Sequence, residues 1–313
     1  MKKLVPILII AILLTFTACG KEVTEEKKTV NIGGLKGPTS IGMLKLLDDE
    51  KYQLTMGAAA DEITPKFLQG ELDIISVPAN LASVLYSKTN GNIETIAVNT
   101  LGVIYIVENG GNEINSIADL KGKTIYATGK DTTPGYALTY LLSENGLSID
   151  DVNIIWKSEP TEVVSQMAIE EHSIAMLPQP FVTVAETKLP NLRIAVDMTK
   201  AWDELDNGSR FITSVIITRK DFANENPDVV EAFLEDYETS VNYMNENLEE
   251  AGALCEQYDI VKSAIAKKAI PYCNMVCITG DDMKTALEGY LKILYDENKT
   301  AVGEKLPLED FYG

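Results

Sequence analysis

Histidine and cysteine, which most often bind metals or carry nucleophilic chemistry, are scarce in this sequence. The only histidine is His172, and beyond the N-terminal region the cysteines are Cys255, Cys273 and Cys277. Three is an odd number, so a fully paired disulfide framework is excluded, although one bridge remains open. A Cys/His metal site would need partners that His172 lacks. We therefore expect no metal, no cofactor and no catalytic residue.

Positive charge is also in short supply. The chain has 27 Lys and Arg residues against 47 Asp and Glu residues, which gives a net charge of −20 at pH 7. This balance opposes binding to nucleic acid or to an anionic membrane surface, because neither phosphate neutralisation nor a polybasic patch is available. It favours solubility outside the cell. At 313 residues the chain is long enough for two domains of ordinary size.

An apolar run near the N-terminus has the form of a secretory signal. It covers residues 4–16 after a basic start, and it is too short to span a bilayer, which needs about 20 residues. An alanine followed by Cys19 resembles a bacterial lipoprotein cleavage site, although Phe16 stands where leucine is usual. We expect residues 1–18 to be a signal peptide and residues 19–29 to be a charged tether that begins at a diacylated Cys19. Ordinary cleavage with release of the protein is the alternative.

After the tether, apolar strands alternate with helices in two series. The first series opens in residues 30–47 with a strand, a glycine-rich turn and a helix. A polar break at residues 108–111 separates it from the second series. One further strand follows at residues 214–218, and beyond it the pattern is helical to the end of the chain. Near-continuous apolar strands between helices indicate mostly parallel sheets that are covered on both faces.

Four motifs carry a family resemblance. They are LQGELDIISVPANLAS (68–83), DLKGKTIYATG (119–129), TTPGYALTYLL (132–142) and ENPDVVEAFLEDY (225–237). Together with the lipoprotein signal and the two α/β series, they resemble the solute-binding proteins of bacterial ABC importers, in the group for nitrate, sulfonates, taurine and thiamine precursors. The resemblance covers the chain from Val30 onward.

The resemblance implies a fold and a set of partners. The fold is α/β and two-lobed, of the type II periplasmic-binding-protein kind, with a mostly parallel sheet and flanking helices in each lobe. Lobe one is expected to comprise residues 30–103 and a mainly helical part at 212–313 that packs on it, and lobe two is expected to comprise residues 104–211. The chain is expected to be a monomer, anchored outside the cell by its lipid alone. It would bind a small-molecule solute and deliver it to an ABC permease with its ATPase subunits.

In such a fold the ligand lies in a cleft between the lobes, and loops at the strand ends supply its contacts. Hydroxyls and backbone N–H groups gather at two predicted helix starts, residues 37–40 and 132–136. Asp61 and Glu62 could instead cap the dipole of their own helix, and Arg210 could form a salt bridge on the hinge surface. Aromatic side chains at such positions often pack in the core for their area alone. The predicted ligand-binding residues are Gly37, Pro38, Thr39, Ser40, Asp61, Glu62, Pro78, Asn80, Asn99, Thr132, Thr133, Tyr136, Glu159, Gln179, Phe181 and Arg210.

The side chains in these loops predict the class of solute. The carboxylates of Asp61, Glu62 and Glu159 suit an aminopyrimidine or a cationic ring, whereas Arg210 is the one cation in these loops. A charge-assisted hydrogen bond of this kind contributes about 1.5–3 kcal/mol. We therefore expect a small heteroaromatic solute of the thiamine or aminopyrimidine-precursor class, with a sulfonate or nitrate-like anion as the alternative. Some proteins of this fold are enzymes, but His172 has no Ser/Asp or Cys partners in sequence that would form a catalytic set.

The N-terminal signal leads to the first testable prediction. Replacing Cys19 with serine removes the thiol that would receive the lipid, so the variant is expected in the soluble fraction after cell fractionation, whereas the unaltered protein is expected with the membranes. Equal membrane association of the two proteins would contradict lipidation at Cys19.

Overall fold

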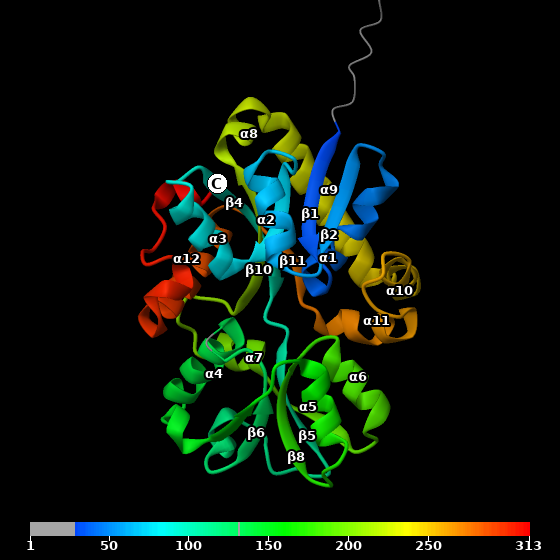
Figure 1. Ribbon diagram of the computed structural model, residues 1–313, viewed down its shortest axis with the longest axis vertical. Helices are drawn as coiled ribbons and strands as arrows, with labels where there is room; N and C mark the ends of the chain where they lie inside the picture. The colour runs from blue at the N-terminus through cyan, green and yellow to red at the C-terminus, as the bar shows by residue number, and fades with distance from the viewer. Residues whose placement is uncertain (1–28, 131) are drawn as a thin grey trace, which may run out of the picture.

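The computed structural model describes residues 29–130 and 132–313. It consists of two lobes, one above the other in Figure 1, that are joined by strands near the middle of the molecule. This arrangement confirms the predicted two-lobed α/β fold. The predicted signal peptide, Cys19 and the tether as far as residue 28 lie outside the described residues. Within the described ranges, no helix is long and apolar enough to cross a membrane.

Lobe one contains a six-stranded sheet, and its central strands are buried on both faces. Strands of this kind are apolar along nearly their whole length, as the continuous run in β3 illustrates, because helices cover the sheet from both sides. The strands, in the order in which they lie side by side, are β11 (Met275–Ile278), β4 (Ile93–Leu101), β10 (Ile212–Arg219), β3 (Ile74–Pro78), β1 (Val30–Leu35) and β2 (Tyr52–Gly57).

The helices of lobe one come from both ends of the chain. The C-terminal part is mainly helical, as predicted, but it also contributes the short strand β11 to the sheet edge beside β4. Four residues of strand between two helices give too short an apolar run to be recognised from periodicity. The helices are α1 (Pro38–Ile41), α2 (Ala60–Leu68), α3 (Ala79–Lys88), α8 (Lys220–Glu225), α9 (Pro227–Glu246), α10 (Leu248–Gln257), α11 (Ser263–Ala269) and α12 (Gly280–Glu297), and the 3-10 helix η5 (Lys299–Val302) follows them.

Lobe two is smaller and is built around a five-stranded sheet. Its strands, in spatial order, are β7 (Asn153–Trp156), β6 (Thr124–Ala127), β8 (Ser173–Pro178), β5 (Ile104–Asn109) and β9 (Leu192–Asp197). Its helices are α4 (Thr133–Glu144), α5 (Pro160–Met167), α6 (Phe181–Lys188) and α7 (Met198–Asp203).

Both sheets are mixed, because strands that cross between the lobes run against their neighbours. In lobe two, β6 pairs in parallel with β7 and β8, whereas β5 pairs antiparallel with β8 and β9. In lobe one, β10 is antiparallel to both β3 and β4. A strand that arrives from the other lobe enters its sheet from the cleft end, which reverses its direction. The strands β1–β3 and β6–β8 therefore pair in parallel, and the strands that arrive from the other lobe, β5 and β10, run against their neighbours. The short edge strand β11 is also antiparallel to β4, although it does not come from the other lobe.

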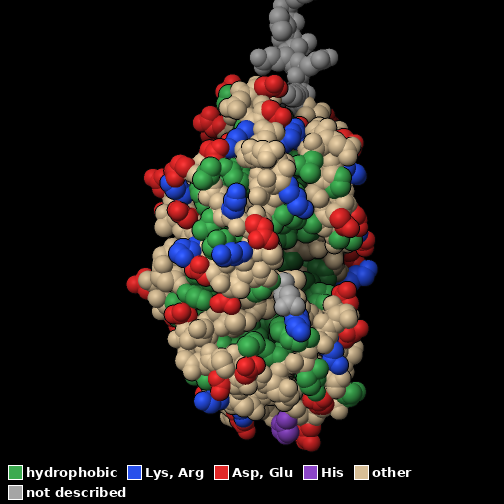
Figure 2. All heavy atoms as spheres, turned by 60° about the vertical axis from the view of Figure 1, so that its left-hand side comes forward, with side chains coloured by type: hydrophobic (Ala, Val, Ile, Leu, Met, Phe, Trp, Pro, Cys, Tyr) green, Lys and Arg blue, Asp and Glu red, His purple; other side chains and the backbone are tan. Residues whose placement is uncertain are grey.

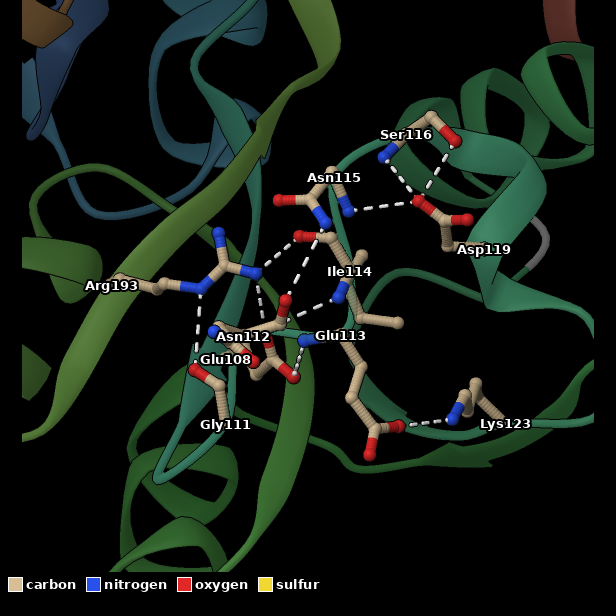
Figure 3. Close-up of polar contacts among 10 residues, drawn as sticks. All are labelled: Glu108, Gly111, Asn112, Glu113, Ile114, Asn115, Ser116, Asp119, Lys123 and Arg193. Atoms are coloured by element: carbon tan, nitrogen blue, oxygen red, sulfur yellow. Dashed lines mark hydrogen bonds and ion pairs between the residues drawn. The ribbon is translucent and has the colours of Figure 1, made fainter.

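An ion pair between a buried carboxylate and an arginine whose side chain is 31% exposed stabilises lobe two at the end of β5. The Glu108 side chain is 5% exposed and lies 2.5 Å from Nη2 of Arg193 on the neighbouring strand β9. The same carboxylate accepts hydrogen bonds from the backbone N–H groups of Glu113, at 3.0 Å, and Ile114, at 3.3 Å. Arg193 also donates to the carbonyls of Gly111 and Ile114, as Figure 3 shows. The pair thereby fixes the loop that follows β5 against β9.

Removing one partner of this pair is expected to destabilise the protein strongly. Glu108→Gln leaves Arg193 without its counter-charge and weakens two backbone hydrogen bonds, so the free energy of unfolding in a urea titration is expected to fall by about 3 kcal/mol. The matched control is Glu113→Gln, which removes an exposed ion pair with Lys123, drawn in the same view, and is expected to cost below about 1 kcal/mol. Equal losses in the two variants would contradict this account.

Candidate functional site

A cavity of about 570 Å³ lies between the lobes, beside the two crossings. This volume falls within the range of about 300–1,000 Å³ that is typical of small-molecule sites. Figure 2 shows a hollow at the waist of the molecule with hydrophobic side chains around it. The described residues that line the cavity are Pro78, Asn80, Leu81, Val84, Val103, Ile104, Thr132, Thr133, Pro134, Tyr136, Phe211, Thr213, Thr300 and Ala301.

Two helix starts form opposite walls of the cavity. Helix α3 begins directly after Pro78, the last residue of β3, so Asn80 lies in its first turn at the carboxyl end of the strand. Helix α4 begins after Thr132, whose backbone is extended and whose hydroxyl donates to the Gly129 carbonyl at 2.8 Å. Gly129 has φ +82°, a conformation that suits glycine, and it turns the chain from β6 into the helix. The strand-turn-helix pattern thus places both first turns at the cleft.

The cavity wall is mostly apolar and, among the described residues that line it, carries no charge. Leu81, Val84, Val103, Ile104 and Phe211 supply the apolar surface. The polar groups are one amide, that of Asn80, and several hydroxyls. A group that carries a full charge would lose its hydration here without meeting an opposite charge on these residues. The wall therefore suits an uncharged molecule with a few hydrogen-bonding atoms.

An aromatic cluster adjoins the cavity at the crossings. The Phe211 ring stacks on Trp202 with ring centroids 5.4 Å apart, and Tyr290 of α12 packs against both rings. Burial raises the pKa of the Tyr290 hydroxyl above its ordinary value, so this group stays protonated. Tyr140 of α4 contacts Trp202 at 4.6 Å between centroids. Because α4 and α12 belong to different lobes, the cluster joins the lobes next to the hinge.

The structure brings together only part of the predicted set. The members that line the cavity are Pro78, Asn80, Thr132, Thr133 and Tyr136. They come from the starts of α3 and α4, and only the second of these is one of the two helix starts at which the sequence predicted a cluster of hydroxyls and N–H groups. Their contact with a ligand stays a prediction.

Of the predicted residues at the start of α1, Thr39 joins Asn99 in a hydrogen-bonded network inside lobe one, whereas the buried Ser40 hydroxyl has no hydrogen-bond partner among the described residues. The Asn99 amide donates to the Thr39 carbonyl and to the Ser76 hydroxyl, each at 2.9 Å, and accepts from the Ser214 hydroxyl at 2.7 Å. These bonds connect α1 to β3, β4 and β10. The four residues Gly37, Pro38, Thr39 and Ser40 are not among those that line the cavity, and a ligand role for them and for Asn99 stays a prediction.

The predicted charged residues lie outside the cavity lining and face local partners or solvent. Asp61 and Glu62 are exposed in the first turn of α2, where Glu62 accepts from the Ala58 backbone N–H at 3.2 Å. Both carboxylates lie near the N-terminus of α2, where negative charge interacts favourably with the helix dipole, and a ligand role for them stays a prediction. Arg210 forms two hydrogen bonds with Asp203, at 2.8 and 3.2 Å, as in the hinge-surface alternative.

The last three predicted residues lie at helix starts of lobe two and are also absent from the cavity lining. Glu159 is exposed at the N-cap of α5. Gln179 is buried, and its side-chain oxygen accepts from the hydroxyl of Thr183 at 3.0 Å. Phe181 is half-buried and packs with the core of lobe two. Ligand contact by these residues also stays a prediction.

Several lining residues were not among the predicted ones: Leu81 and Val84 lie further along α3, Pro134 lies in the first turn of α4, and Phe211 precedes β10. Val103, Ile104 and Thr213 lie in the crossing strands, where an apolar strand pattern gives no sign that one face borders a cavity. Thr300 and Ala301 belong to η5, which reaches the cavity because α12 packs against α3 and α4. No local motif in the C-terminal segment signals this placement.

Comparison with solved structures shows the same fold in several proteins. An ABC transporter from Parabacteroides distasonis is 21% identical, with coverage of 91% of this chain and 99% of that chain and a TM-score of 0.78. The periplasmic aliphatic sulphonate binding protein SsuA from Escherichia coli is 15% identical, with coverage of 90% and 92% and a TM-score of 0.69. The desulfurization enzyme DSZB is 12% identical, with coverage of 91% and 96% and a TM-score of 0.62. At these identities the likeness establishes the fold.

Sequence comparison adds the family. A search of curated proteins gives no match. The family model described as NMT1/THI5 like matches residues 91–251, which is more than half of the 313 residues. The matched region runs from β4 through all of lobe two into α10, and it includes the α4 wall of the cavity. The chain therefore belongs to the NMT1/THI5-like family.

Proposed function

We propose that this protein is the solute-binding component of an ABC import system and that it captures a small, uncharged heteroaromatic solute between its lobes. Family membership and the likeness to an ABC transporter protein and a sulphonate binding protein support the transport role. In this proposal the protein acts outside the cell, held to the membrane by a lipid on Cys19, and delivers its solute to a permease driven by ATPase subunits.

The composition of the cavity wall is the observation that carries the choice of solute. Flat apolar surface from Leu81, Val84 and Phe211 can cover the faces of an aromatic ring. The second N–H of the Asn80 amide can donate to a ring nitrogen, and the Thr132 hydroxyl, which donates to Gly129, can accept from an exocyclic amine. An aminopyrimidine has both features and fits within about 570 Å³. The carboxylates of Asp61, Glu62 and Glu159, from which the sequence predicted this class of solute, do not line the cavity.

An anionic solute is the alternative, and the described lining gives it little support. A sulfonate or nitrate ion would need several donors and preferably a cation to replace its hydration. Neither lysine nor arginine occurs among the described lining residues, and Arg210 is already paired with Asp203. The net charge of −20 also lowers the local concentration of anions.

Catalysis on this fold is the other class of function, since DSZB shares the architecture. The described lining of the cavity offers threonine hydroxyls, one tyrosine and one amide, but no histidine, cysteine or carboxylate that could activate a nucleophile or move a proton. His172 borders a separate pocket at the far end of lobe two, beside Glu108 and Glu170. These observations favour binding over chemistry.

Calorimetry with four compounds tests the proposed solute class. Hydroxymethylpyrimidine is expected to bind with a micromolar dissociation constant, thiamine more weakly because of its fixed positive charge, and taurine and nitrate not measurably. Leu81→Trp fills the apolar part of the cavity and is expected to weaken pyrimidine binding about tenfold or more. Leu68→Trp, at an exposed position on α2, serves as the matched control and is expected to leave binding unchanged.

Two outcomes would contradict the proposal. The first is micromolar binding of taurine or nitrate with no binding of the pyrimidine. The second is pyrimidine binding that Leu81→Trp leaves intact, because the solute would then occupy another place.

A further inference from the structure

Two side chains in the first turn of α4 form hydrogen bonds to the other lobe. The Thr133 hydroxyl donates to the Asn80 side-chain oxygen at 3.3 Å, and the Tyr136 hydroxyl accepts from the Asn298 side-chain nitrogen at 2.8 Å. Helix α4 belongs to lobe two, whereas Asn80 lies in α3 and Asn298 follows α12, both in lobe one. These bonds exist only while the lobes are together, because their partners belong to different lobes.

The Asn298 amide is oriented for this bond by its neighbours. Its side-chain oxygen accepts from the Thr300 backbone N–H at 3.0 Å and from the Thr300 hydroxyl at 2.8 Å, which caps η5. Its backbone N–H donates to the Leu294 carbonyl at 2.8 Å and ties it to the end of α12. With the oxygen held by Thr300, the amide nitrogen points to Tyr136. Little rotamer freedom is lost when the bond forms.

The Asn80 amide is held by the same segment. Its nitrogen donates to the Ala301 carbonyl at 3.2 Å, so its oxygen faces Thr133. Thr300 and Ala301 themselves line the cavity. The short segment 298–301 thus forms part of the wall and also orients both amides that reach across to α4.

We propose that residues 298–301 act as a latch that favours the closed arrangement of the lobes through the Asn298–Tyr136 and Asn80–Thr133 hydrogen bonds. Asn298 is a positioning residue in this account, because it holds Tyr136 against the cavity without lining the cavity itself. The latch acts whichever solute is bound. It raises the closed population of the free protein and slows solute release.

Interlobe distance measurement by double electron–electron resonance tests the latch without any solute. Spin labels are placed on Leu68→Cys and Ile169→Cys, two exposed positions in different lobes, in a full-length Cys19→Ser/Cys277→Ser background. Tyr136→Phe removes one hydroxyl and Thr133→Val removes the other. The loss of one hydrogen bond changes an equilibrium constant by about fivefold. In each variant the ratio of closed to open molecules is therefore expected to fall by about fivefold.

Matched controls remove hydroxyls that bond within lobe two. Tyr126→Phe removes a hydroxyl that donates to Glu170, and Thr139→Val removes one that bonds to the Gly135 carbonyl in its own helix. Both are expected to leave the distance distribution unchanged. Unchanged distances in Tyr136→Phe and Thr133→Val, or an equal shift in the controls, would overturn the proposal.

A double-mutant cycle tests the Asn298–Tyr136 bond itself. Asn298→Ser keeps a capping oxygen for η5 but does not reach Tyr136, so it is expected to open the lobes as far as Tyr136→Phe does. Combining the two changes is expected to give no further opening, because both remove the same bond. Fully additive opening would overturn the assignment. If Asn298→Ser fails to fold, Tyr136→Phe against Tyr126→Phe still decides the question.

Discussion

The rest of the structure depends on how the chain passes between its two sheets at Gly102. The Gly102 carbonyl accepts hydrogen bonds from the Thr199 hydroxyl of α7 at 2.8 Å and from the Asn274 amide of the C-terminal part at 2.6 Å. A side chain would not fit there, since a Cβ on Gly102 would lie 2.3 Å from both the Phe211 ring and the Thr199 hydroxyl. This close contact holds the two crossings side by side. Val103, the next residue along the chain, lines the cavity together with residues of α3 and α4.

The chain is strongly acidic, yet the described residues that line the cavity between the lobes carry no charge. Glu108 meets Arg193 inside lobe two, Arg210 meets Asp203 at the hinge surface, and the remaining ion pairs of the described residues also lie outside the cavity lining. If the cavity holds the solute, as we propose, selection among solutes would depend on shape and on a few hydrogen bonds. Thr133, Tyr136 and Asn80 also form hydrogen bonds between the lobes, so under our proposals solute affinity and lobe closure would be linked through the first turn of α4.

Local patterns in the sequence predicted the two-lobed fold and some of the residues that line the cavity between the lobes. The strand-turn-helix signals at Pro78 and Thr132 are encoded by neighbouring residues, and both of these loops reach the cavity. The charged residues that were predicted to bind the ligand instead contact residues near them in the sequence. Glu62 accepts from a backbone N–H four residues away, and Arg210 donates to Asp203, seven residues away. Such short-range partners compete with any ligand, and their geometry follows from the fold. The contribution of Asn298 depends on the packing of α12 against α3 and α4, which no local pattern encodes.

The central claim is that an uncharged heteroaromatic solute occupies the cavity between the lobes. Native mass spectrometry of the protein purified from its own cells tests it most directly, because a tightly held solute remains bound in that measurement. The account predicts an adduct whose mass and fragmentation identify a neutral nitrogen heterocycle, and the adduct should be absent from Leu81→Trp purified in the same way. A sulfonate or another anion in its place, or an adduct that persists in Leu81→Trp, would contradict the account.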